Sequence, residues 1–168
     1  MPAVATFNRK EVVEAIRAAF RDVTLGDGVP LRESDVIDDY GSLEERAAAR
    51  ALDFQGPWWE VPREDLKEYS SVFIFMDAQG FRYYLPRYMT EALIETNGRL
   101  GTFAWMTLEI LESAQQFGHL PDFDLAQKRA ILCFVEALEH LEPGIATAPC
   151  FGRDYLDVWA YWAEQVQE

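Results

Sequence analysis

The chain has 168 residues and a formal net charge of −14, and apolar residues make up 49% of it. This apolar share, with 14% aromatic residues, is enough for a hydrophobic core and excludes an intrinsically disordered protein. The excess of acid argues against binding to nucleic acid or to an anionic lipid surface, because both require Lys and Arg to meet phosphates. We therefore expect a single globular domain over residues 1–168.

Three further features bear on the compartment. The apolar run over residues 72–76, like every other apolar run in the chain, is far shorter than the roughly 20 residues of a membrane-spanning helix. Charged residues interrupt the N-terminal segment, so it lacks the apolar centre of a signal peptide. Two cysteines, Cys133 and Cys150, do not make a disulfide framework for a chain of this length. The sequence predicts a cytoplasmic protein with reduced thiols.

Helical signals are clear in the first third of the chain. Residues 9–23 carry apolar side chains at three- and four-residue spacing, which predicts an amphipathic helix with Asn8 as its cap. Ser42 and Glu45 form a capping box, the arrangement in which the two side chains cap each other's backbone N–H groups. An alanine-rich helix is therefore expected over residues 42–53.

The middle of the chain has the composition of a β-hairpin. Residues 71–76 are β-branched and aromatic, which is typical of a strand. The following Asp-Ala-Gln-Gly sequence has turn chemistry, with Gly80 suited to a positive φ. Residues 81–85 continue as a second strand, and Pro86 ends it because proline has no N–H to donate to a ladder. The pattern predicts a hairpin near 71–85.

Helical patterns cover most of the remaining chain. The further helices that we expect are residues 62–68, 87–97, 102–117, 123–141 and 153–166. A lone hairpin is unstable in water and has to pack on helices. The predicted fold class is therefore α+β, a predominantly helical single domain with about six to seven helices and one small antiparallel hairpin.

Half of the net charge falls between Asp22 and Glu45, where eight acidic residues opposed by Arg32 alone give −7. A calcium loop is excluded, because with Gly41 at its sixth position the first position would be Val36. The segment is either a solvated acidic loop or a docking surface that attracts a basic partner. The candidate partner-binding acids are Asp35, Asp38, Asp39, Glu44 and Glu45.

Residues 81–89 combine three tyrosines with two arginines. Such clusters form the energetic centres of many protein interfaces. They also suit a hairpin that packs on helices, with the tyrosine hydroxyls finding partners at the rim. Both interpretations remain open, and the candidate partner contacts here are Tyr83, Tyr84, Arg87 and Tyr88.

Motifs for catalysis or metal binding are weak. Cys133, Glu136 and His140 share one face of a helix, but the helical spacing places that face opposite the apolar stripe, on the solvent side. Glu109 and Glu112 lie one turn apart, and nothing in the sequence marks either carboxyl for acid–base chemistry. We expect no cofactor and no bound metal.

Three segments resemble a bacterial family of unknown function. These are residues 52–58, the apolar run 72–76 and the Tyr-Tyr-Leu-Pro-x-Tyr-Met sequence at 83–89. The helical sequence over 127–138 is similar to the C-terminal part of that family. The resemblance implies a small bacterial cytosolic α+β domain, and it assigns no catalytic residue.

The leading hypothesis is a non-enzymatic acidic binding protein that occludes a basic protein partner. The comparison is with toxin-immunity proteins and is an analogy between classes of protein only. The first alternative is a small hydrolase or metal-assisted enzyme with a site around Tyr83, Tyr84 and Arg87. The second is a homo-oligomeric scaffold, a homodimer formed through the helix that carries Trp159 and Trp162.

Overall fold

The computed structural model describes residues 7–95, 101–147 and 152–167, so that Cys150 and the expected helix end at 96–97 lie outside it. Its α-helices are α1 (Arg9–Ala19), α2 (Leu31–Asp38), α3 (Leu43–Leu52), α4 (Arg63–Glu68), α5 (Ala78–Ile94), α6 (Thr102–Phe117), α7 (Leu125–Leu141) and α8 (Gly152–Gln165). Three 3-10 helices are η1 (Trp58–Glu60), η2 (Ser70–Phe75) and η3 (Ile145–Thr147). No strand occurs in these residues, so the α+β prediction is wrong and the described chain is all-α.

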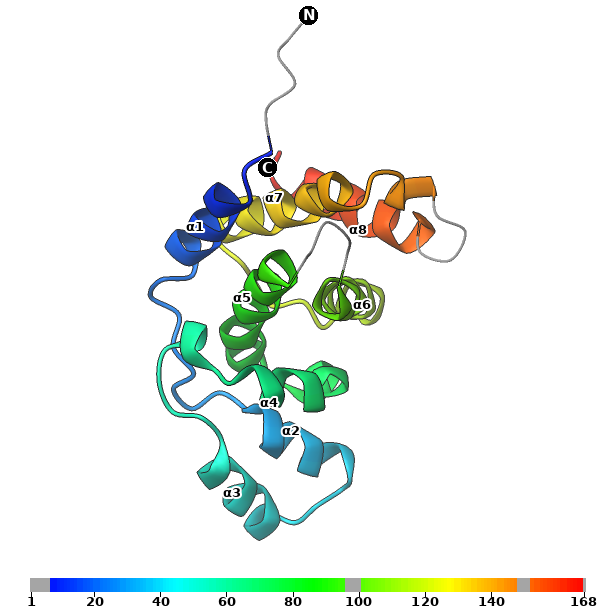
Figure 1. Ribbon diagram of the computed structural model, residues 1–168. Coiled ribbons are helices and arrows are strands. Elements are labelled where there is room, and N and C mark those ends of the chain that lie inside the picture. Colours follow the sequence, from blue (N-terminus) through cyan, green and yellow to red (C-terminus); the bar gives the residue numbers. More distant parts are fainter. Residues whose placement is uncertain (1–6, 96–100, 148–151, 168) are drawn as a thin grey trace, which may run out of the picture.

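Helix α5 is the centre of the core. Figure 1 shows α1, α7 and α8 at one end of the molecule, α5 and α6 in the middle, and α2 with α3 at the opposite end. Helix α5 packs against α6, α1 and η1, and 11 of its residues are buried. Leu85, Met89 and Leu93, at four-residue spacing, are all 0% exposed. Helix α5 therefore lies in the middle of the fold, with α1, α6 and η1 packed on it.

The predicted hairpin is replaced by η2 and the first turns of α5. Asp77 caps α5, because its Oδ1 accepts a hydrogen bond from the backbone N–H of Gly80 at 2.8 Å. The same oxygen accepts a second bond from the backbone N–H of Val29 at 2.9 Å. Val72 and Phe73 are buried, so the strand-like composition of η2 serves core packing, and packing overrides strand propensity here.

Pro86 lies inside α5 instead of ending a strand. A proline in a helix interior removes one backbone hydrogen bond and costs about 3 kcal/mol. The helix nevertheless continues to Ile94, with Pro86 itself buried in the core. Burial of the ring and its neighbours outweighs the cost that made a helix unexpected here.

The capping signals in the sequence locate other helices correctly. At α3 the backbone N–H of Glu45 donates to Ser42 Oγ at 3.2 Å, and that of Ser42 donates to Glu45 Oε2 at 2.7 Å. Asn8 caps α1 by accepting from the backbone N–H of Lys10 at 3.1 Å. These predictions are confirmed because a cap is a local interaction that needs no distant residue.

Replacement of Asp77 tests whether a helix begins at residue 78. Asp77→Ala removes the oxygen that two backbone N–H groups share, so we expect the free energy of unfolding to fall by about 2 kcal/mol. Asp77→Asn keeps an acceptor oxygen in the same place and should lose clearly less. Urea denaturation followed by circular dichroism measures both variants, and equal losses would contradict the capping role.

Candidate functional site

Helices α2 and α3 form a hairpin at one end of the molecule, with α3 outermost (Figure 1). One carboxylate joins the two helices: Glu33 of α2 is 5% exposed. It accepts hydrogen bonds from Arg46 at 2.9 Å and from Arg50 at 2.7 Å, both on α3. The arginines of α3 are therefore turned inward, toward the rest of the protein.

The apolar side of α3 faces solvent as a result. No residue of α3 is buried, and Leu43 and Leu52 are 79% and 74% exposed. The outer face of α3 is defined here as its exposed apolar residues, Leu43, Ala47, Ala48, Ala51 and Leu52, which occupy about half of the helix circumference and share it with the exposed Glu44. Amphipathic helices normally bury this side, and grouped apolar residues on a surface mark sites of interaction.

Tyr40 adds a large aromatic ring to the same end of the hairpin. Its φ is 58°, in the left-handed region that favours glycine, and its side chain is 96% exposed. The turn is closed by the backbone N–H of Gly41, which donates to Val36 O at 2.8 Å. A side chain in this conformation costs about 1–2 kcal/mol, and such strain is concentrated at functional positions. Tyr40 is a candidate anchor that the sequence analysis missed.

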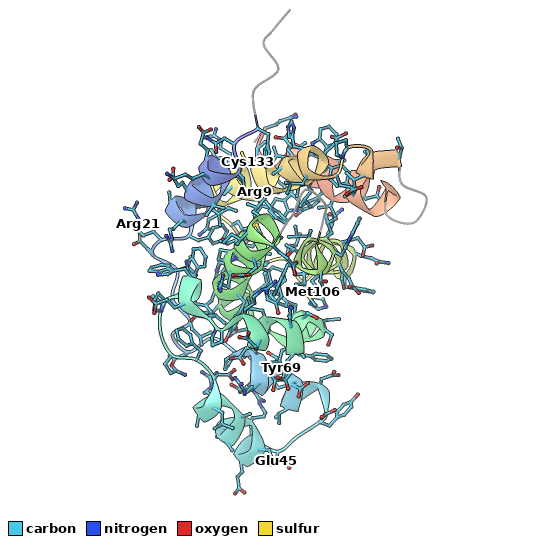
Figure 2. All side chains as sticks on the ribbon, in the orientation of Figure 1. Arg9, Arg21, Glu45, Tyr69, Met106 and Cys133 are labelled. Atoms are coloured by element: carbon cyan, nitrogen blue, oxygen red, sulfur yellow. The ribbon has the colours of Figure 1, made fainter. Side chains whose placement is uncertain are left out.

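The predicted partner-binding acids surround this hairpin. Asp38, Asp39, Glu44 and Glu45 are exposed, and Asp35 is half-buried. Glu45, labelled in Figure 2, lies at the far end of the molecule. Burial, together with the negative charges of Asp39, Asp38 and Glu68, raises the pKa of Asp35 above its ordinary value. The acids therefore repel one another, and a cationic partner would relieve that repulsion.

The three tyrosines predicted as partner contacts lie in the core. Tyr83 and Tyr88 are 0% exposed, and Tyr84 is 1% exposed. The hydroxyl of Tyr83 donates to Gly56 O at 2.8 Å, and the hydroxyl of Tyr84 accepts from the backbone N–H of Leu31 at 3.4 Å. Burial raises the pKa of Tyr83 to about 12 and also raises the pKa of Tyr84 and of Tyr88. Of the two interpretations of this stretch, the burial favours packing.

Arg87 is also turned toward the protein. It is half-buried, its Nε donates to Val61 O at 3.1 Å, and its guanidinium pairs with Glu91 of the same helix. An enzyme needs reactive groups that a substrate can reach. The inward placement of Tyr83, Tyr84 and Arg87 argues against a catalytic site at this position.

The structure also places the other residues that the sequence singled out. On α8, Trp162 is 1% exposed and Trp159 is 39% exposed, so only one of the two rings is available to a second copy. Cys133, Glu136 and His140 lie on the solvent side of α7, as the helical spacing predicts. Among the described residues, no group of three His, Cys, Asp or Glu side chains could hold a metal ion. None of the described helices is long and apolar enough to cross a membrane.

Fold and surface together define an all-α protein with a projecting acidic hairpin whose outermost helix presents an apolar face. Residues 8–166 match a family described as a family of unknown function (DUF6714), and the chain belongs to that family. This confirms the resemblance to an uncharacterised family. The comparisons found no match to this chain among curated proteins and none among solved structures. The family assigns no activity, so the function has to be argued from the surface itself.

Glu33→Gln tests how α3 is held. The substitution leaves two half-exposed arginines without their counter-ion, so we expect the free energy of unfolding to fall by about 2 kcal/mol. The amide protons of α3 should exchange faster than in the wild-type protein. Glu44→Gln, an exposed change in α3 itself, is the matched control and should alter stability by no more than about 0.5 kcal/mol. Unchanged exchange in Glu33→Gln would disprove this role of Glu33.

Asp35→Asn tests the repulsion among the acids. Because the pKa of Asp35 is raised, the folded protein binds more protons at this carboxyl than the unfolded chain does, and stability falls as pH rises from the ordinary pKa of 3.8 through the raised value. Asp35→Asn should therefore be more stable than the wild-type protein at pH 7. The gain should vanish below the ordinary pKa of 3.8. Urea midpoints at the two pH values measure this, with the exposed Asp22→Asn as control.

Proposed function

We propose that this protein is a non-enzymatic binding protein that takes a basic protein partner on the α2–α3 hairpin and masks the partner's surface. The observation that carries the proposal is the outward apolar face of α3. Arginines that face inward and leucines that face solvent contribute no apolar packing to the protein's own core. The arrangement suits a second protein that covers the face.

The apolar residues would supply the binding energy. Tyr40, Leu43 and Leu52 are the most exposed large apolar side chains of the described residues. Burial of such a side chain is worth about 1.5–3 kcal/mol, and tyrosine is among the residues enriched at the energetic centre of interfaces. The alanines between the two leucines have short side chains, so a partner helix or loop can approach the backbone of α3 closely.

The acids would select the partner and increase its rate of approach. Asp38, Asp39, Glu44 and Glu45 are exposed beside the outer face of α3. Complementary charge raises association rates and disfavours partners of like charge. A second copy of this chain brings the same acids to the interface, whereas a basic protein brings Lys and Arg. The charge therefore favours a basic partner with an apolar patch over self-association through this face.

The test is a capture experiment with a tagged full-length protein in lysate of the native host, washed at low and then at high salt. We expect one stoichiometric basic partner that high salt releases. The double variant Leu43→Ser, Leu52→Ser should reduce its recovery at least about tenfold, because the apolar contacts are lost. Both residues are exposed, so thermal unfolding should stay close to that of the wild-type protein.

Leu156→Ser is the matched control, since Leu156 is 44% exposed on α8, away from the hairpin. This variant should retain the partner. If Leu156→Ser abolishes capture while the α3 double variant retains it, the interface lies on α8 and the proposal is wrong. A partner that is acidic or indifferent to salt would disprove the electrostatic part.

A further inference from the structure

A small pocket lies on a different part of the molecule, between η2 and α6. It has a volume of about 160 Å³. The rings of Phe73 and Phe81 line it and pack edge to face, with centroids 5.0 Å apart. Ile110 lines it from α6, and Met106, labelled in Figure 2, marks the side of α6 on which it lies. This α6 pocket is separate from the α2–α3 hairpin in its residues and in its elements.

Small side chains on two facing segments leave this space open. Ser70 and Ser71 begin η2, and Ser113 and Ala114 lie opposite on α6. Helix α6 and η2 are in contact, so short side chains at these positions leave a gap that leucine or phenylalanine would fill. The apolar lining and the volume together match cavities of about 150 Å³, which accept a molecule of the size of benzene.

Polar groups gather around the same pocket. Glu109 and Ser113 are one helical turn apart on α6, so they lie on the same face. Helix α6 ends at Gly118 with a φ of 69°, and the backbone N–H of His119 donates to Ala114 O at 2.8 Å. This turn brings His119 to the pocket as well.

The polar side chains of this pocket are free to meet a ligand. In residues 7–95, 101–147 and 152–167, the side chains of Glu109, Ser113 and His119 have no hydrogen bond to another protein group. Glu109 is exposed, whereas Ser113 is half-buried. A carboxylate and a hydroxyl beside an apolar floor form an amphipathic binding site.

We propose that the α6 pocket binds small primary amines whose apolar part is about the size of one benzene ring. The ammonium group donates to the carboxylate of Glu109 and to the hydroxyl of Ser113, and the ring lies against Phe73 and Phe81. A carboxylate ligand of the same shape is repelled by the negative charge of Glu109 and by the protein's net charge of −14, so it binds more weakly. A neutral analogue has the apolar contacts without the charge-assisted hydrogen bond.

Benzylamine, benzyl alcohol and benzoate are the probes, because they share a ring and differ in the charge of the head group. Titration of the full-length protein, followed by calorimetry and by amide chemical shifts, should give a dissociation constant of about 1 mM or below for benzylamine. Benzyl alcohol should bind at least about tenfold more weakly, and benzoate more weakly still. The shifted amides should include those of Glu109, Ser113 and Phe81.

Two variants localise the binding. Glu109→Gln should weaken benzylamine about tenfold and leave benzyl alcohol unchanged, because it removes only the charge. Glu60→Gln is the control for net charge, since Glu60 is exposed and outside this pocket, and it should bind like the wild-type protein. Ser113→Leu should fill the pocket and block all three probes, and Glu109→Gln remains decisive if that variant folds poorly.

The proposal is overturned if benzylamine causes no shifts at about 10 mM, or if the three probes bind equally well. It is also overturned if Glu109→Gln binds benzylamine as the wild-type protein does. The variants lie on α6, so neither result bears on the partner proposed for α3.

Discussion

The structure depends on the burial of a tyrosine-rich helix in the middle of the core. Water is excluded around α5, so each hydroxyl there has to find a protein partner. The hydroxyl of Tyr83 donates a hydrogen bond to the loop carbonyl of Gly56, and that of Tyr88 donates to the carbonyl of Leu66 in α4. The hydroxyl of Tyr84 accepts a hydrogen bond from the backbone N–H of Leu31, the first residue of α2. These bonds tie the start of α2, the loop that follows α3, and α4 to α5. The segments that flank the α2–α3 hairpin in the chain are therefore joined to the core through α5.

The sequence predicted most helices but not the segment that matters most for the core. Ser42 and Glu45 predict the start of a helix, because their capping interaction lies within four residues and needs no distant part of the chain. The run over 71–85 carries the residues that both a strand and a buried helix need, and Asp-Ala-Gln-Gly suits either a turn or a cap. Only the packing around α5 decides between a strand and a helix. Pro86 wrongly indicated the end of a strand, because burial outweighs the local cost of a proline within a helix.

The candidate site was also predicted only in part, because its charges can be read from the sequence but its tertiary contacts cannot. Counting charges located the acidic segment, since charge depends on composition alone. The count of acids over residues 22–45 included Glu33, but it could not reveal that Glu33 pairs with arginines 13 and 17 residues further on. Nor does an alanine-rich sequence reveal which side of its helix faces outward. The α6 pocket was missed because Ser70 and Ser113 are brought together only by the tertiary fold.

The exposed face of α3 also has a colloidal consequence. An apolar surface in water attracts other copies of itself at short range, so dispersion of the unbound protein relies on long-range repulsion between molecules. At pH 7 the net charge of −14 supplies that repulsion. The net charge falls to zero near the isoelectric point of about 4.5, where enough carboxylates are protonated for the rest to balance the cations, while the leucines stay exposed. The acids that we propose attract a partner would thus also keep the protein dispersed while that partner is absent.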